Sequence, residues 1–456
     1  MSTLTPHISI LTLDPNTTHR LNACAYQQSA LTTLANTQYA AFYTPTADPS
    51  TRWVTLARRT LQSSQWHHLT FTDYPQRTDD GHNTISIGIC AGDGTIHVAF
   101  DHHCDELHYR ISRAGLAYDA RAASWTAASF GGVQSHLPGW VALIDVTYPR
   151  FVSAGRKLLF ECRIGRAGAG SEALYLYTPR TYTPHTTPQS LYLHGDHCNP
   201  YPNGLSFHAP TNTLHLTWTN RHFVAYDGAT DAASTAHKAQ AGPNGPENNE
   251  GLYYISAVLA EEPDGRTVGI EWKDLQGESL MSASFAQITP IGEVNGAGLD
   301  SQDPRLRVRD IPRGSGIMNQ EGQFVDPRGG VHVLNRENTR GREAWVYYSF
   351  GPTGWESWPV EGVSPTETGR RGKVVWCAGV VWLVLPENER EEMVLGRWVD
   401  QKFVVVWRGA GVTGEPLVDE VALLQDVLSF LALRVVGDGR EVVVLDFDLT
   451  RWSALP

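Results

Sequence analysis

The densest group of side chains that could do chemistry is the segment DHHCDELHYR, from Asp101 to Arg110. It directly follows an apolar run, TIHVAF, so its polar residues stand where a β-strand ends in a loop. Two adjacent histidines at such a position suit proton transfer near neutral pH, because an unperturbed imidazole has a pKa of about 6.5. A histidine pair without a partner one helical turn away is a weak signal for zinc. We therefore favour acid–base chemistry over a metal site or a simple hydrogen-bonded turn.

Two later polar clusters also stand beside strand-like runs. VTYPRF, at 146–151, is followed by FECRIGR, in which Arg163 lies at the end of the run. NPYPNGLSF, at 199–207, is followed by WTNRH at 218–222. Three successive units thus offer His, Arg and Asn-Arg at equivalent positions. Such positions converge if the units surround one axis, and they would then enclose one ligand with cations and proton-transfer groups.

The runs that must position these clusters are short and bounded by Gly, Asp, Asn and Pro, whereas helical periodicity is scarce. This pattern is typical of all-β proteins. A turn followed by an inner-strand-like run recurs roughly every 50 to 60 residues, a spacing that suits four-stranded propeller blades. The runs are QYAAFYT, GDGTIHVAF, AGRKLLFEC, TNTLHLTW, RGGVHVLN, AGVVWLVL and VLSFLALRVV. We predict a seven-bladed β-propeller, with eight blades as the alternative.

One interval between these runs, from Trp218 to Gly330, is about twice as long as the others. It holds either an extra blade or a long insertion, and the Gly-, Pro-, Asn- and Ala-rich stretch 227–249 favours an insertion. We predict one domain over residues 1–456 with an inter-strand insertion around 227–315. Histidines inside strand runs are interpreted as structural, and so is the arginine that closes a strand pair: His97, His215, His332 and Arg110.

Composition excludes several classes of protein. The net charge of −12 argues against a nucleic-acid partner, because phosphate binding depends on clustered Lys and Arg. No apolar run approaches the roughly 20 residues that span a bilayer, so we expect no membrane partner. The six cysteines include no CxxC pair, which excludes a zinc ribbon or a disulfide framework as the organising feature. We expect a monomer, and 1–18 shows no secretory signal pattern.

Several segments together resemble the BNR-repeat β-propeller polysaccharide lyases, which include ulvan lyases and L-rhamnose-α-1,4-D-glucuronate lyases. The likeness runs in order from Gly81 to Asn338, and the residues beyond match only as repeats. The segments that carry it are GHN, ICAGDGTIHVAFDHHCDELHYR, VTYPRF, NPYPNGLSF with TLHLTWTNR, and MNQEGQFVDPRGGVHVLNREN.

This resemblance implies a central pocket for glucuronate and cleavage of the bond at its O4. The catalytic residues that it implies are His82, His102, Tyr148 and Arg163. Substrate-binding candidates, chosen at the same blade ends, are His103, Arg150, Asn199, Tyr201 and Arg221. It also implies an extracellular location and no cofactor for the chemistry, while the ligands of a structural Ca²⁺ or Zn²⁺ are not legible in the sequence.

The residue types suit β-elimination. The C5 proton of a uronate becomes acidic only when its carboxylate is neutralised, which Arg163 would do. His82 or His102 would take the C5 proton and return one to O4, which lies on the same face, with Tyr148 as partner or alternative proton donor. The expected substrate is the unsulfated rhamnosyl-glucuronate end of arabinogalactan, as in gum arabic, because no run of basic residues marks a rim for sulfated repeats. The alternatives are a hydrolase of the same linkage, an ulvan lyase and a non-catalytic carbohydrate-binding propeller.

Overall fold

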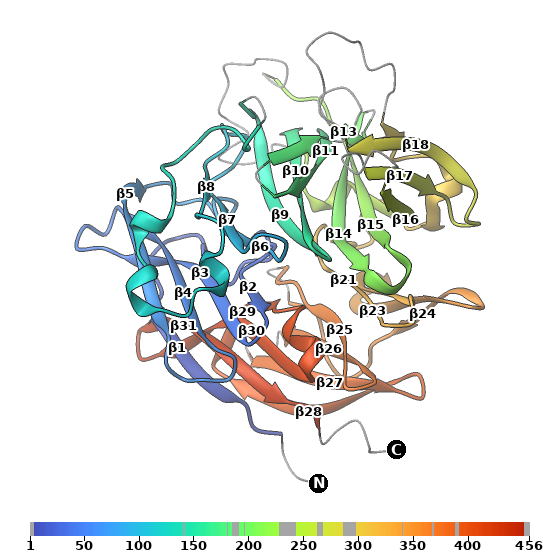
Figure 1. Cartoon of the computed structure of the whole chain (residues 1–456). Helices are drawn as coiled ribbons and strands as arrows, with labels where there is room; N and C mark the ends of the chain where they lie inside the picture. The colour runs from blue at the N-terminus through green and yellow to red at the C-terminus, as the bar shows by residue number, and fades with distance from the viewer. Residues whose placement is uncertain are drawn as a thin grey trace.

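Seven β-sheets follow one another in a ring and form a seven-bladed β-propeller, as the sequence predicts (Figure 1). The computed structural model describes residues 4–139, 142–179, 181–184, 191–195, 197–227, 243–261, 268–285, 298–339, 341–366, 369–387 and 392–450. Within these ranges the helical segments are short 3-10 turns. No helix of the described chain has the length and apolar character needed to cross a membrane.

The first three blades occupy the N-terminal part of the chain. Blade one contains β2 (Leu31–Leu34), β3 (Thr37–Pro45), β4 (Arg52–Thr60) and β5 (His67–Gln76). Blade two contains β6 (Ile85–Cys90), β7 (Thr95–Phe100) and β8 (Tyr109–Ile111), followed by turns η1 (Leu116–Tyr118), η2 (Ala122–Ser124) and η3 (Ala127–Ser129). Blade three contains β9 (Val146–Ala154), β10 (Lys157–Arg166), β11 (Ala169–Thr178), β12 (Thr181–Pro184) and β13 (Leu191–His194).

The remaining four blades follow the same order. Blade four contains β14 (Cys198–His208), β15 (Thr213–His222), β16 (Asn249–Glu261), β17 (Val268–Lys273) and β18 (Ser279–Phe285). Blade five contains β21 (Gly322–Val325), β22 (Val331–Thr339), β23 (Arg342–Gly351) and β24 (Gly354–Pro359). Blade six contains β25 (Lys373–Cys377), β26 (Val380–Glu387), β27 (Glu392–Val399) and β28 (Lys402–Ala410). Blade seven joins β29 (Val412–Val418), β30 (Val427–Val436) and β31 (Gly439–Asp448) to β1 (His7–Leu13).

The long interval between the repeats contains strands of blade four, because β16, β17 and β18 all lie within 227–315. Two short strands follow them: β19 (Leu299–Asp300) pairs with β13 of blade three, and β20 (Arg307–Arg309) pairs with β16. Residues 228–242, 262–267 and 286–297 of the predicted insertion lie outside the described residues.

The hydrophobic core lies between neighbouring blades. Leu56 and Phe71 of blade one pack in one cluster with Ile87 and Val98 of blade two. Large aromatic side chains fill the later interfaces, and four of them are fully buried: Trp218, Trp272, Trp345 and Trp382. Replacement of one of these indoles by alanine would destabilise the fold by about 3–5 kcal/mol, because a cavity would remain.

The ring closes by pairing the two ends of the described chain. Strand β1 runs antiparallel to β31, from His7 opposite Asp446 to Leu13 opposite Glu441. Blade seven is tied to blade one by a buried ion pair, in which Arg59 Nη2 lies 2.7 Å from Asp446 Oδ1. The last blade therefore depends on strands from both ends.

The first strand of each blade lies innermost, since β2, β6, β9, β14, β21, β25 and β29 contact one another in that order. Within a blade the second strand is antiparallel to the first, so the start of one meets the end of the other. Side chains just before or early in the first strand therefore share one end of the axis with side chains late in the second strand. This geometry explains why the polar clusters recur at those positions.

Candidate functional site

A closed circuit of eight side chains surrounds this end of the axis, and we call it the axial ring. Its members come from blades one to six and touch in the order His82, Tyr148, Arg163, Tyr201, Arg221, Asn319, Arg371 and Tyr26. Five of them were predicted from the sequence: His82, Tyr148, Arg163, Tyr201 and Arg221.

One half of the ring alternates tyrosines with guanidinium groups. The ring centroids of His82 and Tyr148 lie 5.7 Å apart, and the guanidinium carbon of Arg163 lies 4.8 Å from the Tyr148 centroid. Arg163 Nη1 donates to the Tyr201 hydroxyl at 3.1 Å, and Arg221 lies 4.5 Å from the Tyr201 ring centroid. Cations over aromatic faces are attracted by the negative face of the ring, which fixes both guanidinium groups in place.

The other half consists of residues that the sequence analysis missed, apart from Arg221 and His82. Asn319 Oδ1 accepts from Arg221 Nη2 at 2.8 Å and from Arg371 Nη2 at 3.2 Å. Arg371 lies 4.9 Å from the Tyr26 ring centroid, and Tyr26 stacks on His82 with centroids 4.7 Å apart. Tyr26, Asn319 and Arg371 all stand a few residues before an innermost strand, and that shared position was the signal that could have identified them.

Bulges in the innermost strands direct two of the tyrosines. The pairing of β9 with β10 shifts register between Glu161 and Arg163, and Tyr148 has a positive φ of 58°. A second shift, between Pro202 and Gly204, interrupts β14 just after Tyr201. A bulge bends the strand and re-aims its side chains, and a tyrosine in the left-handed region is strained. The fold thus accepts local strain to place Tyr148 in the axial ring.

His82 is paired with a second imidazole through a shared carboxylate. Asp80 Oδ1 lies 2.5 Å from His82 Nδ1, and Asp80 Oδ2 lies 2.6 Å from His103 Nδ1. The two imidazoles stack with centroids 3.9 Å apart and planes 17° apart. Because Tyr26 covers the opposite face, His82 is enclosed on both faces and can meet a ligand only along its edge.

The electrostatics of this pair favour a neutral base. Burial lowers the pKa of the His82 imidazole to about 4, although the hydrogen bond to Asp80 favours the protonated form. Burial opposes ionisation of Asp80, but hydrogen bonds from His103 and His82 outweigh it and hold the pKa of this carboxyl well below its usual range. At neutral pH the Nδ1 atom of His82 is therefore bound to a carboxylate, and its ring is uncharged.

His102, which we expected to act in catalysis, lies outside the axial ring. Its side chain is fully buried, and its Nε2 accepts the backbone N–H of His108 at 2.8 Å. Burial, together with nearby His108, holds the pKa of His102 well below its usual value. The neighbouring His103, expected to bind substrate, takes the place beside His82.

Two of the substrate-binding candidates also lie outside the ring. Arg150 forms an internal ion pair, with Nη1 3.1 Å from Glu161 Oε2, and also donates to Gln28. Asn199 is fully buried, and its side-chain amide donates to the Pro200 carbonyl. Arg150 is thus held in an internal ion pair, whereas the Asn199 side chain lies beside that of Arg163, since both border Gly170.

Two arginines of the ring are buried without a carboxylate partner among the described residues. Arg163 is 1% exposed and donates to Tyr201 and to Thr147 Oγ1, the latter at 2.9 Å. Arg221 is 6% exposed and donates to Asn249 Oδ1 at 2.8 Å as well as to Asn319. A buried charge is costly when no carboxylate forms an ion pair with it, although the buried Glu172 lies opposite Arg163 on the neighbouring strand and favours its charged form. Both guanidinium groups therefore favour an anionic ligand at this end of the axis.

A further carboxylate anchors the ring from blade seven. Glu415 of β29 accepts from the backbone N–H groups of Ala25 and Arg371, and its Oε1 lies 3.3 Å from Arg371 Nη1. Burial opposes ionisation of Glu415, but the charges of Arg20 and Arg371 outweigh it and lower its pKa. This single side chain holds both the loop that carries Tyr26 and the loop that carries Arg371.

The described residues include one group of side chains close enough to share a metal ion, namely Asp80, His82 and His103. An imidazole nitrogen binds a metal in the plane of its ring. The planes of His82 and His103 are nearly parallel and stacked, so one ion cannot lie in both. As arranged, these residues fit a hydrogen-bonded pair around a carboxylate and do not fit a metal centre.

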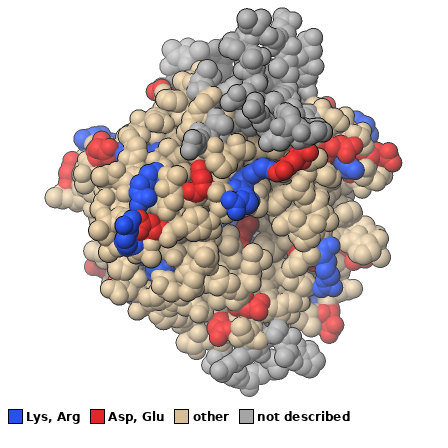
Figure 2. Space-filling model, viewed as in Figure 1, with Lys and Arg blue, Asp and Glu red and all other residues tan. Residues whose placement is uncertain are grey.

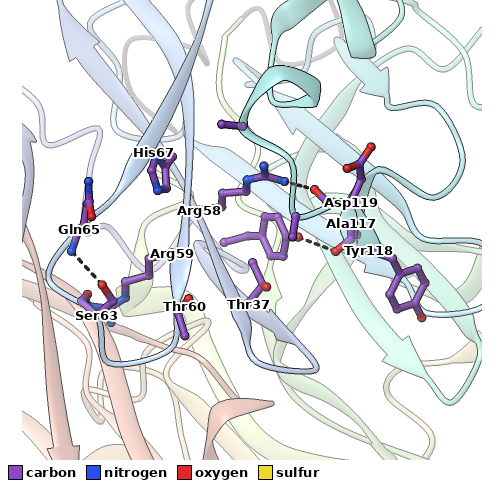
Figure 3. Close-up of a pocket in the computed structure, with 13 residues that line it drawn as sticks. Thr37, Arg58, Arg59, Thr60, Ser63, Gln65, His67, Ala117, Tyr118 and Asp119 are labelled. Carbon is purple, nitrogen blue, oxygen red and sulfur yellow. Dashed lines mark hydrogen bonds between the residues drawn. The ribbon is translucent and has the colours of Figure 1, made fainter.

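A separate cavity of about 220 Å³ lies beside blade one (Figure 3). It is lined by Thr37, Arg58 and Thr60 together with Tyr118 and Asp119 of the segment after β8. Arg58 Nη1 donates to the Asp119 carbonyl at 2.6 Å. No residue of the axial ring lines this cavity, so we place the functional site at the ring.

The outer surface contrasts with the cationic ring. Figure 2 shows acidic and basic side chains interspersed over the face in view, without a broad basic patch. The positive charges of Arg163 and Arg221 are instead buried at the axis. An acidic ligand would thus be recognised inside the ring and not on this outer face.

Comparisons with known proteins agree with this architecture. A model of the BNR repeat-containing family matches residues 37–362. The structure is similar to that of the polysaccharide lyase Uly1, with a TM-score of 0.67 and 14% identity over 98% of this chain and 100% of that one. It is also similar to a PL25 ulvan lyase, with a TM-score of 0.59 and 13% identity over 95% of each chain.

The PL25 ulvan lyase bound to -[GlcA(1-4)Rha3S]- gives a TM-score of 0.59 at 12% identity, again over 95% of each chain. At these identities the likeness demonstrates the shared fold. A search of curated proteins found no match.

Proposed function

This chain belongs to the BNR repeat-containing family, and on that premise we propose that it is a polysaccharide lyase acting on glucuronate. The observation that carries the proposal is that one tyrosine contacts both a neutral imidazole and a guanidinium that forms no ion pair with a carboxylate of the described residues. His82 and Arg163 both lie against Tyr148, and both are held by neighbours that fix their orientation. Uronate β-elimination needs this combination of a base and a buried cation.

Arg163 neutralises the substrate carboxylate. With that charge offset, the electrons left by the C5 proton can be delocalised towards the carboxyl group, which makes the proton acidic. A guanidinium is suited to this role because it binds a carboxylate through two parallel hydrogen bonds. The low exposure of Arg163 strengthens the interaction, since little water competes for the charge.

His82 transfers the proton. Its Nε2 takes the C5 proton, the C5–H electron pair forms the C4=C5 double bond, and the C4–O4 bond breaks. O4 leaves with a proton returned by the His82 imidazolium, because C5–H and O4 of glucuronate lie on the same face. Burial raises the pKa of the Tyr148 hydroxyl well above its usual value, so Tyr148 keeps its proton and can hydrogen-bond the departing O4.

For the substrate we propose the L-rhamnose-α-1,4-D-glucuronate end of arabinogalactan side chains, with release of rhamnose and an unsaturated glucuronate. The support is chemical: a ulvan lyase of similar fold is bound to -[GlcA(1-4)Rha3S]-, which contains the same two sugar types with sulfate on the rhamnose. An unsulfated end is favoured because the sequence contains no run of basic residues that could form a rim for sulfated repeats.

The test is incubation with gum arabic while ultraviolet absorbance and free rhamnose are followed together. Lyase action raises both, because the C4=C5 bond is conjugated with the carboxyl group. Rhamnose without absorbance would identify a hydrolase of the same linkage. Absorbance with ulvan alone would move the substrate to the sulfated polymer. Binding of either polymer without any product would identify a carbohydrate-binding propeller and end the lyase proposal.

A further inference from the structure

Asp80 lies in a turn that holds its carboxylate in place. The backbone N–H of His82 donates to Asp80 Oδ1 at 2.9 Å, and the backbone N–H of Asn83 donates to the Asp80 carbonyl at 3.0 Å. The turn leads directly into β6, the innermost strand of blade two. These backbone hydrogen bonds therefore hold the Asp80 carboxylate independently of its contacts with the two imidazoles.

We propose that Asp80 is the positioning residue of the site: it fixes His82 and His103 as Nδ1–H tautomers, so that the lone pair of the His82 imidazole lies on Nε2. The proposal rests on the proposed lyase function and names the unit that moves its proton. It also assigns His103, in place of His102, as the second imidazole of that unit.

The tautomers follow from hydrogen-bonding capacity. An ionised carboxylate only accepts hydrogen bonds, so each nitrogen that it contacts must carry the hydrogen. Asp80 contacts Nδ1 of both rings, at 2.5 and 2.6 Å. A neutral imidazole has one N–H, and hence Nε2 of His82 is unprotonated. A base with its lone pair on a fixed atom is what proton abstraction requires.

The charges limit the unit to one added proton. One carboxylate can offset one imidazolium, and a second imidazolium 3.9 Å away would meet like charge. The other groups around His82 are Tyr26, Tyr148 and Arg163, and the last of these opposes its protonation. On the other side, Asp105 accepts the backbone N–H of His103 at 3.2 Å. His82 thus takes up the C5 proton at Nε2, Asp80 offsets the charge of the imidazolium through Nδ1, and the proton is returned to O4.

Asp80→Asn tests the proposal with almost no change in shape. The amide keeps one acceptor oxygen but presents a donor to the other imidazole, which must then accept at Nδ1 and carry its hydrogen on Nε2. We expect kcat on gum arabic to fall by about 10²–10⁴-fold, with KM nearly unchanged. Loss of the carboxylate also favours neutral imidazole, so the acidic limb of kcat/KM should move to lower pH.

The neighbouring residue provides a matched control. Asp79 also contacts a histidine, with Oδ1 3.3 Å from His19 Nδ1, but it lies outside the axial ring and the histidine pair. Asp79→Asn should retain kcat and the acidic limb. A wild-type kcat in Asp80→Asn would contradict the positioning role. So would a loss of activity that matches the loss of folded protein while the acidic limb of kcat/KM stays in place.

A second measurement separates this proposal from the lyase proposal. Nitrogen-15 NMR of the histidine rings reports which ring nitrogen carries the hydrogen, and His82→Gln and His103→Gln identify the two signals by their loss. We expect Nδ1–H for both rings in the wild type and Nε2–H for one in Asp80→Asn. Nε2–H signals in the wild type would overturn the Asp80 proposal, even if the enzyme released product. Nδ1–H signals in a protein that yields no product would support Asp80 and reject the lyase.

Discussion

His82 and His103 stack face to face, with ring centroids 3.9 Å apart, while Asp80 joins them at one edge. Tyr26 lies on the other face of His82, so no sugar can cover this imidazole from above or below. The opposite edge, which carries Nε2, is where a proton can be exchanged with a ligand. Four predictions follow from this arrangement and from the charges around it.

The two histidines expected from the sequence to act in catalysis should behave differently on substitution. His82→Ala removes the base, and turnover of gum arabic should fall by about 10²–10⁴-fold. His102→Ala removes the acceptor of the His108 N–H and should destabilise the fold by about 1–3 kcal/mol, with a far smaller loss of turnover per folded molecule. Product formation normalised to folded protein, measured beside urea unfolding, distinguishes the two. A His102→Ala protein that is stable but inactive would show that His102 takes part in the reaction.

Removal of the Tyr26 ring should change the pH dependence of kcat/KM. His82 must be neutral to accept a proton, so kcat/KM should fall as the pH drops through its pKa of about 4. Because burial is the cause of that low value, Tyr26→Ala should expose His82 and raise its pKa towards about 6.5. The acidic limb should then move to higher pH, while Tyr26→Phe should leave it in place. Coincident limbs for wild type and Tyr26→Ala would show that Tyr26 does not shield the base.

The cation that faces the substrate carboxylate should not tolerate lysine. Arg163→Lys loses the planar fork and the contact with the Tyr148 ring, and kcat/KM should fall by about 10²–10³-fold. Arg59→Lys is the matched control, since Arg59 is equally buried and lies 4.4 Å from the Trp66 ring centroid, but it pairs with Asp446 of β31. It should lower stability and spare turnover. Equal kinetic losses in both variants would mean that Arg163 acts only through the fold.

The free energy of unfolding of the whole propeller should decrease as the pH is lowered from neutral towards 4. Burial lowers the pKa of His97 to about 3 and that of His215 to about 4, whereas in the unfolded chain both lie near about 6.5. Below about pH 6.5 the unfolded state therefore binds more protons, so the stability present at neutral pH is lost as the pH falls. Urea midpoints at pH 7.5 and 5 should show the decrease, and His97→Gln should reduce it. Identical midpoints at the two pH values would contradict this account.

Sequence repetition was sufficient to predict the architecture and much of the site. A residue such as Arg163 is recognisable because it ends a strand at a position that recurs from blade to blade. The exchange of His102 for His103 was not predictable in this way. Asp101 and Cys104 both have positive φ, of 64° and 54°, so the chain reverses at each end of the pair and strand alternation no longer tells which imidazole faces the axis.

Loop residues were missed for a related reason. Tyr26 and Arg371 stand on segments without strand periodicity, and their place in the ring depends on Glu415, which is distant from Tyr26 along the chain. Asp80 precedes the quoted GHN motif, and only the coordinates show that its carboxylate serves two rings. Contacts of this kind arise from closure of the propeller, and the sequence signal for Tyr26 and Arg371 is their shared position shortly before an innermost strand.

The anchoring of the Tyr26 loop by Glu415 also sets an order of events during synthesis. Tyr26 leaves the ribosome early, whereas blade seven appears only at the end, and at roughly 5–20 residues per second the two are separated by tens of seconds. During that time the first six blades can supply every member of the axial ring, but Glu415 is not yet present to anchor the loops of Tyr26 and Arg371. In a nascent or truncated chain that lacks β29, Tyr26 would therefore not be held against His82. The proposed activity would then appear only when blade seven has folded.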